Sequence, residues 1–557
     1  MSKIKFCALG GLGENGKNLY LVTVDDKIFI LDAGIKYPSV DLYGIDAVMP
    51  DFTYLIENKD KIACVILTHG HEENCGAIAE LLKNINIPVY GSKFTIAIVN
   101  QILIENNLDV KDYMLFSVDD SFVLTYDKTS VSFFYTSHSI PESFGVSINT
   151  EDGSVVYVPD FSFGFTKDSH YQTSFSKLNN VKDCLLLCPE SLGVNNINRV
   201  NNDYTFNHMV NDALRNPNRV VFAMYSYDLN RIQKVVDLCV AANRKIAVIG
   251  RKVQRIINVS MNEGYLNVPN ENLVNLKFID ENNTNNDSNL AVIITGVRHE
   301  PYFMLQRMMT NQDKLIKLTE EDVVVTICPP VIGTEKIATR ALDQLSKTGS
   351  KVVNLTKDII KSSHADSEDL KMIYQMLKPK YICPVIGEYR HQYMHKNIAL
   401  EAGYVENQVI VLDNGQEITF DNGKLLDNSV SIEVGDVLVD GSIVGDINEV
   451  VLKDREQLSL EGAMIIVTNI DARNSKIISG PKVYTKGFTS MCDQDLLYSA
   501  IELKTKEIIE RTFVNEFIDW NQLKTDIKDN CTKEVRTLAK KSPIIIPVII
   551  DINEDEL

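Results

Sequence analysis

Two histidines one residue apart, in the segment Thr68-His69-Gly70-His71, constrain this chain more than any other feature. Histidine is scarce, with nine residues in a chain of 557. The preceding residues 62–67 are apolar and partly β-branched, which predicts a short buried strand. A strand that ends in two such imidazoles presents both at its C-terminal tip, as a protein site for a soft metal ion requires.

The length of the chain predicts several domains, because single hydrophobic cores stop growing at roughly 250–300 residues. The longest apolar run near the end, residues 544–550, is too short to cross a bilayer, so we expect no membrane partner. Ten cysteines without a CxxC pair, and no signal-peptide core, favour reduced thiols in the cytoplasm. The net charge of −19 argues against non-specific duplex binding but leaves room for a local basic channel.

Two further candidate ligands, His138 and Asp160, each follow an apolar segment with the character of a strand, residues 131–135 and 155–158. We expect both to emerge at the same edge of a sheet. Three imidazoles and one carboxylate satisfy a single tetrahedral or five-coordinate ion.

Residues 11–16 (Gly-Leu-Gly-Glu-Asn-Gly) match the dinucleotide-binding fingerprint letter for letter. That fingerprint needs a helix to begin there, so that the helix N-terminus can hold a pyrophosphate. The continuation, residues 18–24, is typical of a strand, so we interpret the match as a glycine turn between two strands.

Residues 68–77 resemble the HxHxDH signature of metallo-β-lactamase-fold hydrolases, and Asp32 resembles that fold's first-motif aspartate. Similarity along nearly the whole chain identifies it as a member of the ribonuclease J family, resembling its degenerate second paralogue in Gram-positive bacteria. The supporting segments are residues 34–50, 189–191, 362–365, 384–390, 435–441 and 519–521.

The resemblance implies an α/β fold: a metallo-β-lactamase αββα sandwich, an inserted β-CASP α/β domain and a small C-terminal α/β domain. We assign residues 1–203 and 356–450 to the sandwich, and 204–355 to the β-CASP domain. Residues 451–462, which are highly charged, are interpreted as a linker, and 463–557 as the C-terminal domain.

The family implies a two-metal 5′-to-3′ exoribonuclease that also cuts internally, with an RNA channel between its lobes. The residues that match the first metal's ligands and the bridging aspartate are His69, His71, His138 and Asp160. The residues that stand where the second metal's ligands are expected are Glu73, Asn74 and Ile386.

These replacements predict at most one zinc or manganese ion per chain, or none. Glu73 could still ligate from a displaced position, or serve as a general base. Asn74 offers only a neutral amide oxygen. Ile386 offers no ligand atom and desolvates its surroundings. Since the two-metal mechanism needs both ions, activity is expected to fall by orders of magnitude.

The family also implies an HxSGHxS-like stretch that handles RNA phosphates, and here residues 360–366 carry Ile360 and Asp366 at two of its key positions. The remaining candidates for substrate binding are Ser362, Ser363, His364 and Arg390. His364 either touches RNA or forms a hydrogen bond between lobes. We interpret His391 and His395, four residues apart on an expected helix, as part of a solvated face.

Three functions remain open. The leading one is a weak or inactive ribonuclease J-like protein of RNA processing and decay, which binds single-stranded RNA and acts as structural partner of an active paralogue. A C-terminal helix face with Leu497, Ile501 and Ile508 is suited to packing or dimerisation. The resemblance also implies a homodimer, or a mixed assembly with the paralogue. The second is a slow one-metal exoribonuclease. The third, a small-molecule metallohydrolase, is disfavoured by the β-CASP insertion.

Overall fold

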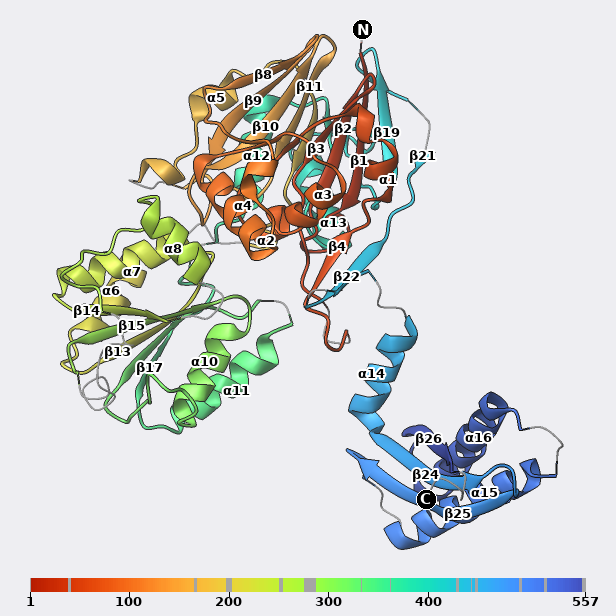
Figure 1. Ribbon diagram of the computed structural model, residues 1–557. Helices are drawn as coiled ribbons and strands as arrows, with labels where there is room; N and C mark the ends of the chain where they lie inside the picture. Colours follow the sequence, from red (N-terminus) through yellow and green to blue (C-terminus); the bar gives the residue numbers. More distant parts are fainter. Residues whose placement is uncertain are drawn as a thin grey trace. The chain divides into compact units, whose positions relative to one another are not determined.

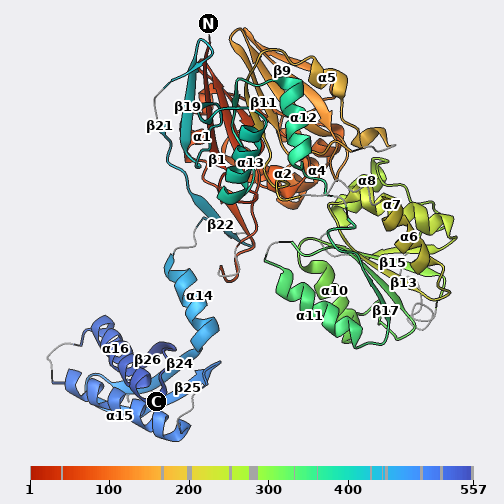
Figure 2. The same ribbon diagram turned by 180° about the vertical axis from the view of Figure 1, so that it is seen from behind.

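A computed structural model gives the conformation of residues 2–38, 42–164, 168–196, 203–249, 254–274, 287–331, 333–360, 362–426, 430–441, 443–445, 449–489, 493–514 and 518–552. Figures 1 and 2 show the chain from opposite sides. It separates into two compact units. The first comprises Met1–Tyr37 and Ala47–Val437, and the second comprises Pro38–Asp46 and Leu438–Leu557.

Two sheets form the centre of the first unit. The first sheet has the order β20 (Lys424–Leu425), β19 (Gln416–Asp421), β1 (Lys3–Gly10), β2 (Leu19–Val24), β3 (Lys27–Leu31), β5 (Ile62–Ile66), β6 (Val89–Gly91) and β7 (Leu115–Ser117), and β21 (Val430–Ser431) also pairs with β19. The second has the order β18 (Tyr381–Ile382), β12 (Cys184–Pro189), β11 (Gly153–Val158), β10 (Ser143–Thr150), β9 (Thr129–Thr136) and β8 (Val123–Tyr126). The segment from residue 416 thus returns to pair with β1.

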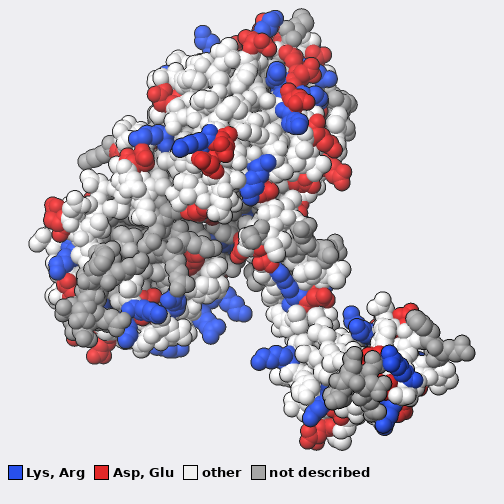
Figure 3. Space-filling view, viewed as in Figure 1, with Lys and Arg blue, Asp and Glu red and all other residues white. Residues whose placement is uncertain are grey.

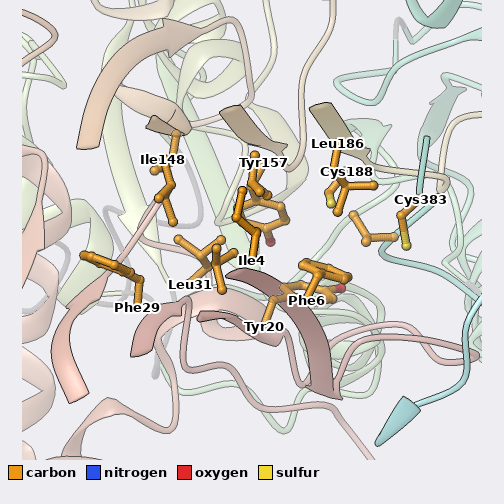
Figure 4. Close-up of a cluster of buried hydrophobic side chains, with 14 of the residues drawn as sticks. Ile4, Phe6, Tyr20, Phe29, Leu31, Ile148, Tyr157, Leu186, Cys188 and Cys383 are labelled. Carbon is orange, nitrogen blue, oxygen red and sulfur yellow. The ribbon is translucent and has the colours of Figure 1, made fainter. Parts of the chain in front are cut away.

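The two sheets pack face to face, and their inward side chains form one hydrophobic cluster (Figure 4). Ile4 and Phe6 from β1 meet Ile148 and Tyr157 from the second sheet, and each is at most 1% exposed. Successive residues of a strand point to opposite faces, so Ile4 and Phe6 share the inner one. Each large apolar side chain buried in this way contributes about 1.5–3 kcal/mol.

Helices cover the outer faces of these sheets. On the second sheet, Phe134 and Val156 pack against Leu370 and Ile373 of α12. The helices on this face are α5 (Phe175–Asn179), α12 (Ser367–Leu377) and α13 (Tyr389–Glu401). Beside the first sheet lie α1 (Thr53–Glu57), α2 (Glu72–Cys75), α3 (Ile78–Asn84) and α4 (Lys93–Glu105), of which α4 packs against β6 and β7. Other short elements of this unit are β4 (Ala47–Pro50) and the 3-10 turns Lys59–Lys61, Val110–Asp112, Ser169–Tyr171 and Glu406–Gln408.

The inserted lobe of the first unit is a doubly wound α/β layer. Its sheet is parallel throughout, in the order β14 (Lys245–Ile249), β15 (Leu290–Gly296), β13 (Val220–Tyr225), β16 (Val323–Ile327) and β17 (Lys351–Asn354). Its helices are α6 (Asp203–Leu214), α7 (Leu229–Ala241), α8 (Gln254–Asn262), α10 (Glu300–Met309) and α11 (Glu335–Ser346). The predicted division of this unit near residues 203 and 355 stays a prediction, since contacts join both lobes into one unit.

The second unit contains the hairpin β22 (Asp436–Asp440) and β23 (Ile443–Val444), helix α14 (Glu449–Glu461), and a three-stranded sheet covered by two helices. That sheet has the order β25 (Lys476–Lys486), β24 (Ala463–Asp471) and β26 (Ile544–Asp551), and its helices are α15 (Gln494–Thr512) and α16 (Trp520–Ala539). The predicted linker, residues 451–462, is therefore mostly helical. Leu497, Ile501 and Ile508 lie in the domain's own core, so this helix face serves packing, one of the two roles expected of it. Among the described helices, none has the length and apolar character needed to cross a bilayer.

Candidate metal centre and the cavity around it

Four side chains converge where three strands of the first unit end. His69 and His71 follow β5, His138 follows β9, and Asp160 follows β11. His71 Nδ1 lies 3.1 Å from His69 Nε2 and 3.2 Å from His138 Nε2. Asp160 Oδ2 lies 3.1 Å from His69 Nε2 and 3.9 Å from His138 Nε2. The structure thus brings together all four residues that the sequence proposed as ligands of one ion.

These four atoms fit one tetrahedral ion. Metal–nitrogen bonds of about 2.0–2.1 Å place neighbouring ligand atoms about 3.3 Å apart at tetrahedral angles. Three of the four separations are close to that value. Three imidazoles and a carboxylate are donors that suit zinc, and a single carboxylate is fewer oxygen ligands than manganese prefers.

The ring nitrogens that point away from this centre fix the state of each histidine. His138 Nδ1 lies 3.0 Å from the carbonyl of Ser363, and His71 Nε2 lies 3.3 Å from the carbonyl of Tyr227. A carbonyl only accepts, so these nitrogens carry the protons and donate them. Thr68 Oγ1 donates to Asp32 and so accepts from His69 Nδ1 at 3.0 Å. Each ring therefore directs a lone pair at the centre, as metal ligation requires.

Burial keeps two of the rings neutral. It lowers the pKa of His71 to about 3, and His69 adds to the effect. Burial also lowers the pKa of His138 well below its ordinary value, against the opposing charge of Asp160. Neutral imidazole is the form that binds a cation.

Asp32 anchors the loop that carries the first two ligands. Its carboxylate accepts hydrogen bonds from the Thr68 amide at 2.8 Å, the Asn74 side chain at 2.7 Å and the Tyr157 hydroxyl at 2.8 Å. Gly34 lets the loop approach, because a Cβ there would lie 1.6 Å from the carbonyl oxygen of Glu73. The first-motif aspartate therefore acts on the centre through the backbone it holds.

The positions at which the family resemblance implies ligands for a second ion carry side chains with other contacts. The Asn74 amide donates to Asp32, and its oxygen accepts from Asn18 at 3.3 Å, so this side chain is committed to the loop. Ile386 is 1% exposed and belongs to the core between the sheets. Among the described residues, neither cluster of candidate ligands includes Glu73. Burial raises the pKa of Glu73 to about 7.

Ile386 also has an unusual backbone, with a φ of +54°. The left-handed region is costly for a β-branched residue, and neighbouring contacts must impose it. Its N–H donates to the Tyr20 hydroxyl at 3.2 Å, and its carbonyl accepts from the Ser191 amide at 3.1 Å. Contacts from two other segments thus hold the backbone at a position where the family resemblance implies a ligand, although an isoleucine side chain cannot ligate.

Glu190 connects the metal centre to the segment before α12, a role that the sequence did not indicate. It is fully buried, and its carboxylate accepts from the Phe161 amide at 2.7 Å, the Ala365 amide at 3.0 Å and His364 Nδ1 at 2.8 Å. His364 Nδ1 also lies 3.2 Å from Asp160 Oδ1. Burial alone would lower the pKa of His364, but Glu190 and Asp160 outweigh it and hold this pKa well above its ordinary value.

The other predicted substrate residues are distributed differently from His364. Ser363 presents its carbonyl to His138, and Ser362 Oγ accepts from the His364 amide at 3.1 Å. Arg390 is exposed on the first turn of α13, paired with Glu388 at 2.7 Å. Asp366 caps α12, with its carboxylate accepting from the amides of residues 368 and 369, so it has a structural role.

The expectation for His391 and His395 was wrong. Both are buried, at 4% and 0% exposed. His395 Nδ1 lies 3.0 Å from Ser191 Oγ, and its Nε2 meets the Tyr374 hydroxyl. An i, i+4 pair of polar residues does not by itself reveal which face of a helix is inside, and here His395 packs on two buried hydroxyl groups.

A cavity of about 180 Å³ adjoins the centre. One wall comes from the sandwich, with His71, Glu73, Asp160 and Ile386, together with His364. The other wall comes from segments that follow four strands of the inserted lobe: Tyr227 after β13, Ile256 after β14, Val297 and Arg298 after β15, and Val331 after β16. The carboxyl ends of parallel strands are the usual ligand-binding edge of such sheets. A larger cavity of about 710 Å³ shares His138, Ser139 and Ser363 with it.

Comparison with known proteins gives three family matches and several full-length relatives. Residues 217–345 match "Ribonuclease J, beta-CASP domain", 352–411 match "Zn-dependent metallo-hydrolase RNA specificity domain", and 450–552 match "Ribonuclease J C-terminal domain". The chain is 32% identical over 552 residues to Ribonuclease J 2 of Staphylococcus aureus, covering 99% of this chain and 98% of the relative. It is 34% identical over 553 residues to Ribonuclease J2 of Bacillus subtilis, covering 99% of each chain.

Among solved structures, a protein of unknown function from Enterococcus faecalis V583 superposes with a TM-score of 0.53 at 16% identity. The match covers 75% of this chain and 100% of that chain. At this identity it supports the fold alone.

Proposed function

Since this chain belongs to the ribonuclease J family, we propose that it binds single-stranded RNA, holds one metal ion and acts chiefly as the structural partner of an active paralogue. It is a ribonuclease J-like protein of RNA processing, with a metal cofactor. Its own hydrolysis of RNA is weak or absent. We propose a cytoplasmic location, because the cysteines among the described residues are buried and form no disulfide, as thiols in a reducing compartment do.

One observation supports the proposal: two of the side chains at the positions expected to hold a second metal are engaged in other contacts. The Asn74 amide is held by Asp32 and Asn18, and Ile386 fills its position with buried hydrocarbon. The two-metal mechanism activates the attacking oxygen and stabilises the leaving oxygen with separate ions. A chain that holds one ion lacks half of that stabilisation.

The first half fits a single cation, held by the three imidazoles and Asp160. When bound, such an ion supplies Lewis-acid polarisation of a phosphate and makes water more nucleophilic. The protein's own contributions lie around it. Thr68 and the carbonyls of Ser363 and Tyr227 orient the rings, and protonated His364 offers a charged donor beside Asp160. The donor set favours zinc over manganese.

The partner role rests on what is retained. The anchors of the ligand loops and the core of the C-terminal domain are intact, while the losses concentrate on ligand positions. A fold that is kept intact still presents the surface that contacts a second protein, even when the chain no longer catalyses a reaction. We therefore propose a hetero-oligomer with the active paralogue, and a homodimer when that paralogue is absent. Native mass spectrometry of the chain alone and co-expressed with the paralogue measures this.

The deciding experiment combines metal analysis with RNA turnover. Protein purified free of paralogues is examined for zinc and manganese per chain, then assayed on 5′-monophosphorylated single-stranded RNA. We expect at most one ion and a rate orders of magnitude below that of the paralogue. His71→Ala serves as the control for contamination, because a trace nuclease is insensitive to it. Two ions per chain with rapid trimming would overturn the proposal.

One observation favours the alternative of a slow one-metal exoribonuclease. Glu73 lines the same cavity as His71 and Asp160, within the space that a substrate phosphate would enter. In that case Glu73→Gln abolishes a slow, metal-dependent activity while leaving metal binding unchanged. If an activity is measurable and this substitution leaves it unchanged, Glu73 takes no part in the reaction.

A further inference from the structure

One acidic side chain joins the sandwich to the inserted lobe beside the metal centre. Glu142 lies between β9 and β10 of the sandwich, and Tyr265 follows α8 of the inserted lobe. The Tyr265 hydroxyl donates to Glu142 Oε1 at 2.8 Å. Glu142 Oε2 accepts from the amide of Phe94, in the first turn of α4, at 3.3 Å. A single carboxylate thus connects the inserted lobe to a helix that covers the first sheet.

Glu142 is itself held from a third segment. Its backbone has a φ of +54°, a conformation that a residue with a side chain adopts at a cost and that neighbouring contacts must impose. The Glu142 amide donates to the carbonyl of His170 at 2.8 Å. His170 Nδ1 lies 3.5 Å from Glu142 Oε1, and the ring meets that of Tyr265 edge-on, with 5.0 Å between centroids. The carboxylate is therefore fixed before Tyr265 reaches it.

Tyr265 also connects the cavity wall to the loop that carries metal ligands. Its amide donates to the carbonyl of Ser260 in α8 at 2.8 Å, and Ile256 on the same helix lines the cavity. The Tyr265 ring contacts that of Phe94 at 5.2 Å. Phe94 packs behind the first two ligand histidines, because a Cβ at Gly70 between them would lie 3.6 Å from Phe94 Cε1. The wall and the ligand loop thus meet through two rings.

The charge of the chain makes such a junction important for holding RNA. The net charge is −19, and basic and acidic side chains intermix on the face shown in Figure 3. Long-range attraction of a polyanion is weak under such a charge. Retention of a strand in the cavity therefore depends on how firmly the two walls stay together around it.

We propose that the contact between Tyr265 and Glu142 is a latch between the two lobes, which sets how readily single-stranded RNA enters and leaves the cavity beside the metal centre. Neither side chain is among the described residues that line the two cavities, so each acts by positioning α8 and α4. The inference rests on the proposed RNA-binding function and deepens it by naming the contact that governs access. The competing interpretation is a contact that only stabilises the fold.

The test measures association and dissociation rates of a fluorescently labelled single-stranded oligoribonucleotide on the full-length chain by stopped flow. Tyr265→Phe keeps the ring and removes the hydroxyl. We expect both rates to rise by about fivefold, as for the loss of one hydrogen bond of ordinary strength. Affinity and its salt dependence should change little, because neither side chain contacts RNA. Amide hydrogen exchange in α8 should become faster without RNA, since opening is easier.

Glu142→Gln should act in the same direction by a smaller factor of about twofold. Its amide oxygen still accepts from Tyr265 and from the amide of Phe94, but it lacks the charge that strengthens these bonds. A residue that only stabilised the fold would lower the melting temperature in both variants without accelerating release. Thermal melts of all variants therefore accompany the rate measurements.

Tyr126→Phe is the matched control. Its hydroxyl donates to the carbonyl of Ala63 at 3.1 Å, a bond of the same kind that lies within the sandwich alone. This variant should leave both rates unchanged. If the unaltered chain binds RNA and Tyr265→Phe matches it in both rates, the inference alone is overturned. If the unaltered chain fails to bind RNA, the proposed function falls, and the inference with it.

Discussion

The two halves of the site share Asp160 and lie on one framework, yet they differ in what their side chains can do. In the first half, three rings and a carboxylate point ligand atoms at one centre, and each ring is oriented by a partner behind it. In the second half, the amide of Asn74 faces Asp32, and Ile386 joins the hydrophobic core. The supporting backbone persists in both halves, including the left-handed conformation at Ile386.

This difference indicates that fold stability constrains the framework residues, whereas metal binding constrains the ligands. Asp32, Gly34 and Tyr157 hold the ligand loop by contacts that also join the two sheets, so their loss would cost stability whether or not a metal binds. A metal-binding histidine at position 386 would not form comparable contacts that stabilise the fold. Side chains that serve only the reaction can therefore disappear while the scaffold stays.

The largest effect is expected from removing a ligand of the intact half of the site. His71→Ala deletes the ligand whose Nδ1 contacts two other rings, and we expect bound metal to fall from about one ion per chain to nearly none. The loss of affinity should exceed the 10–100-fold typical of losing a mere supporting partner. Elemental analysis after dialysis measures it.

The control for this substitution is His208→Ala, an exposed histidine on α6 paired with Asp212. Equal metal content in the His71→Ala and unaltered chains would place the ion elsewhere.

The next prediction rebuilds the emptied half. The triple variant Glu73→Asp, Asn74→His and Ile386→His supplies the ligand types that the family carries. Because the backbone at position 386 is already in place, we expect a second ion and a rise in RNA hydrolysis of about 100-fold, or about 2.7 kcal/mol of barrier. Metal stoichiometry and single-turnover rates check this.

Each single substitution of the three should do little, since it leaves the second ion with too few ligands. A triple variant that still holds one ion would show that the framework has changed more than the structure indicates.

A smaller effect is expected from the partner behind a ligand. Thr68→Val keeps the shape of the side chain but removes the hydroxyl that orients His69 and bonds Asp32. We expect metal affinity to weaken by about 10-fold, at the lower end of the usual range for such partners. Competition with a chelating dye measures it.

Ser139→Ala is the matched comparison, because His71 keeps the carbonyl of Tyr227 when the Ser139 hydroxyl is removed. If both variants bind metal as the unaltered chain does, these hydroxyls play no part in orienting the rings.

The smallest effect concerns the turn beneath the emptied half. Two residues of the turn 11–16 form β-bridges to Gly387. Lys17 and Lys36 form ion pairs that connect Glu14 of this turn to Asp436. Burial opposes the shift, but the two lysines hold the pKa of Asp436 below its ordinary value of 3.8. Its contribution is therefore present above about pH 4 and is lost as the pH falls through the lowered value.

Because Asp436 is partly exposed, that contribution is less than about 1 kcal/mol. Asp436→Asn should flatten the acid side of the stability profile by this amount, as measured in denaturant titrations between pH 3 and pH 7. An unchanged acid limb would show that the ion cluster adds no stability.

Much of the fold and half of the site followed from local patterns. The strand before His69, the strands before His138 and Asp160, and the glycine turn at residues 11–16 all formed as predicted, because each depends on hydrophobicity and turn chemistry within a few residues. The family and the fold class were confirmed by full-length similarity.

Contacts between distant segments could not be predicted. Glu190 binds the amides of Phe161 and Ala365, 29 and 175 residues away, and no local signal marks such a partner. Tyr227 acts through its backbone carbonyl, which every residue possesses. The buried pair His391 and His395 was misread for a related reason, since the spacing of two residues on a helix does not say which neighbour will cover them. The face of α15 was left open between packing and dimerisation, and it packs in the domain core.

The cavity wall formed by the segments after β13 to β16 belongs to a different sheet from the strands that carry the ligands. Side-chain variation in those connecting segments can therefore change what the cavity admits while the four candidate metal ligands stay unchanged. Selectivity and reactivity are inherited on separate pieces of the chain. A paralogue that loses reactivity can therefore still change in selectivity.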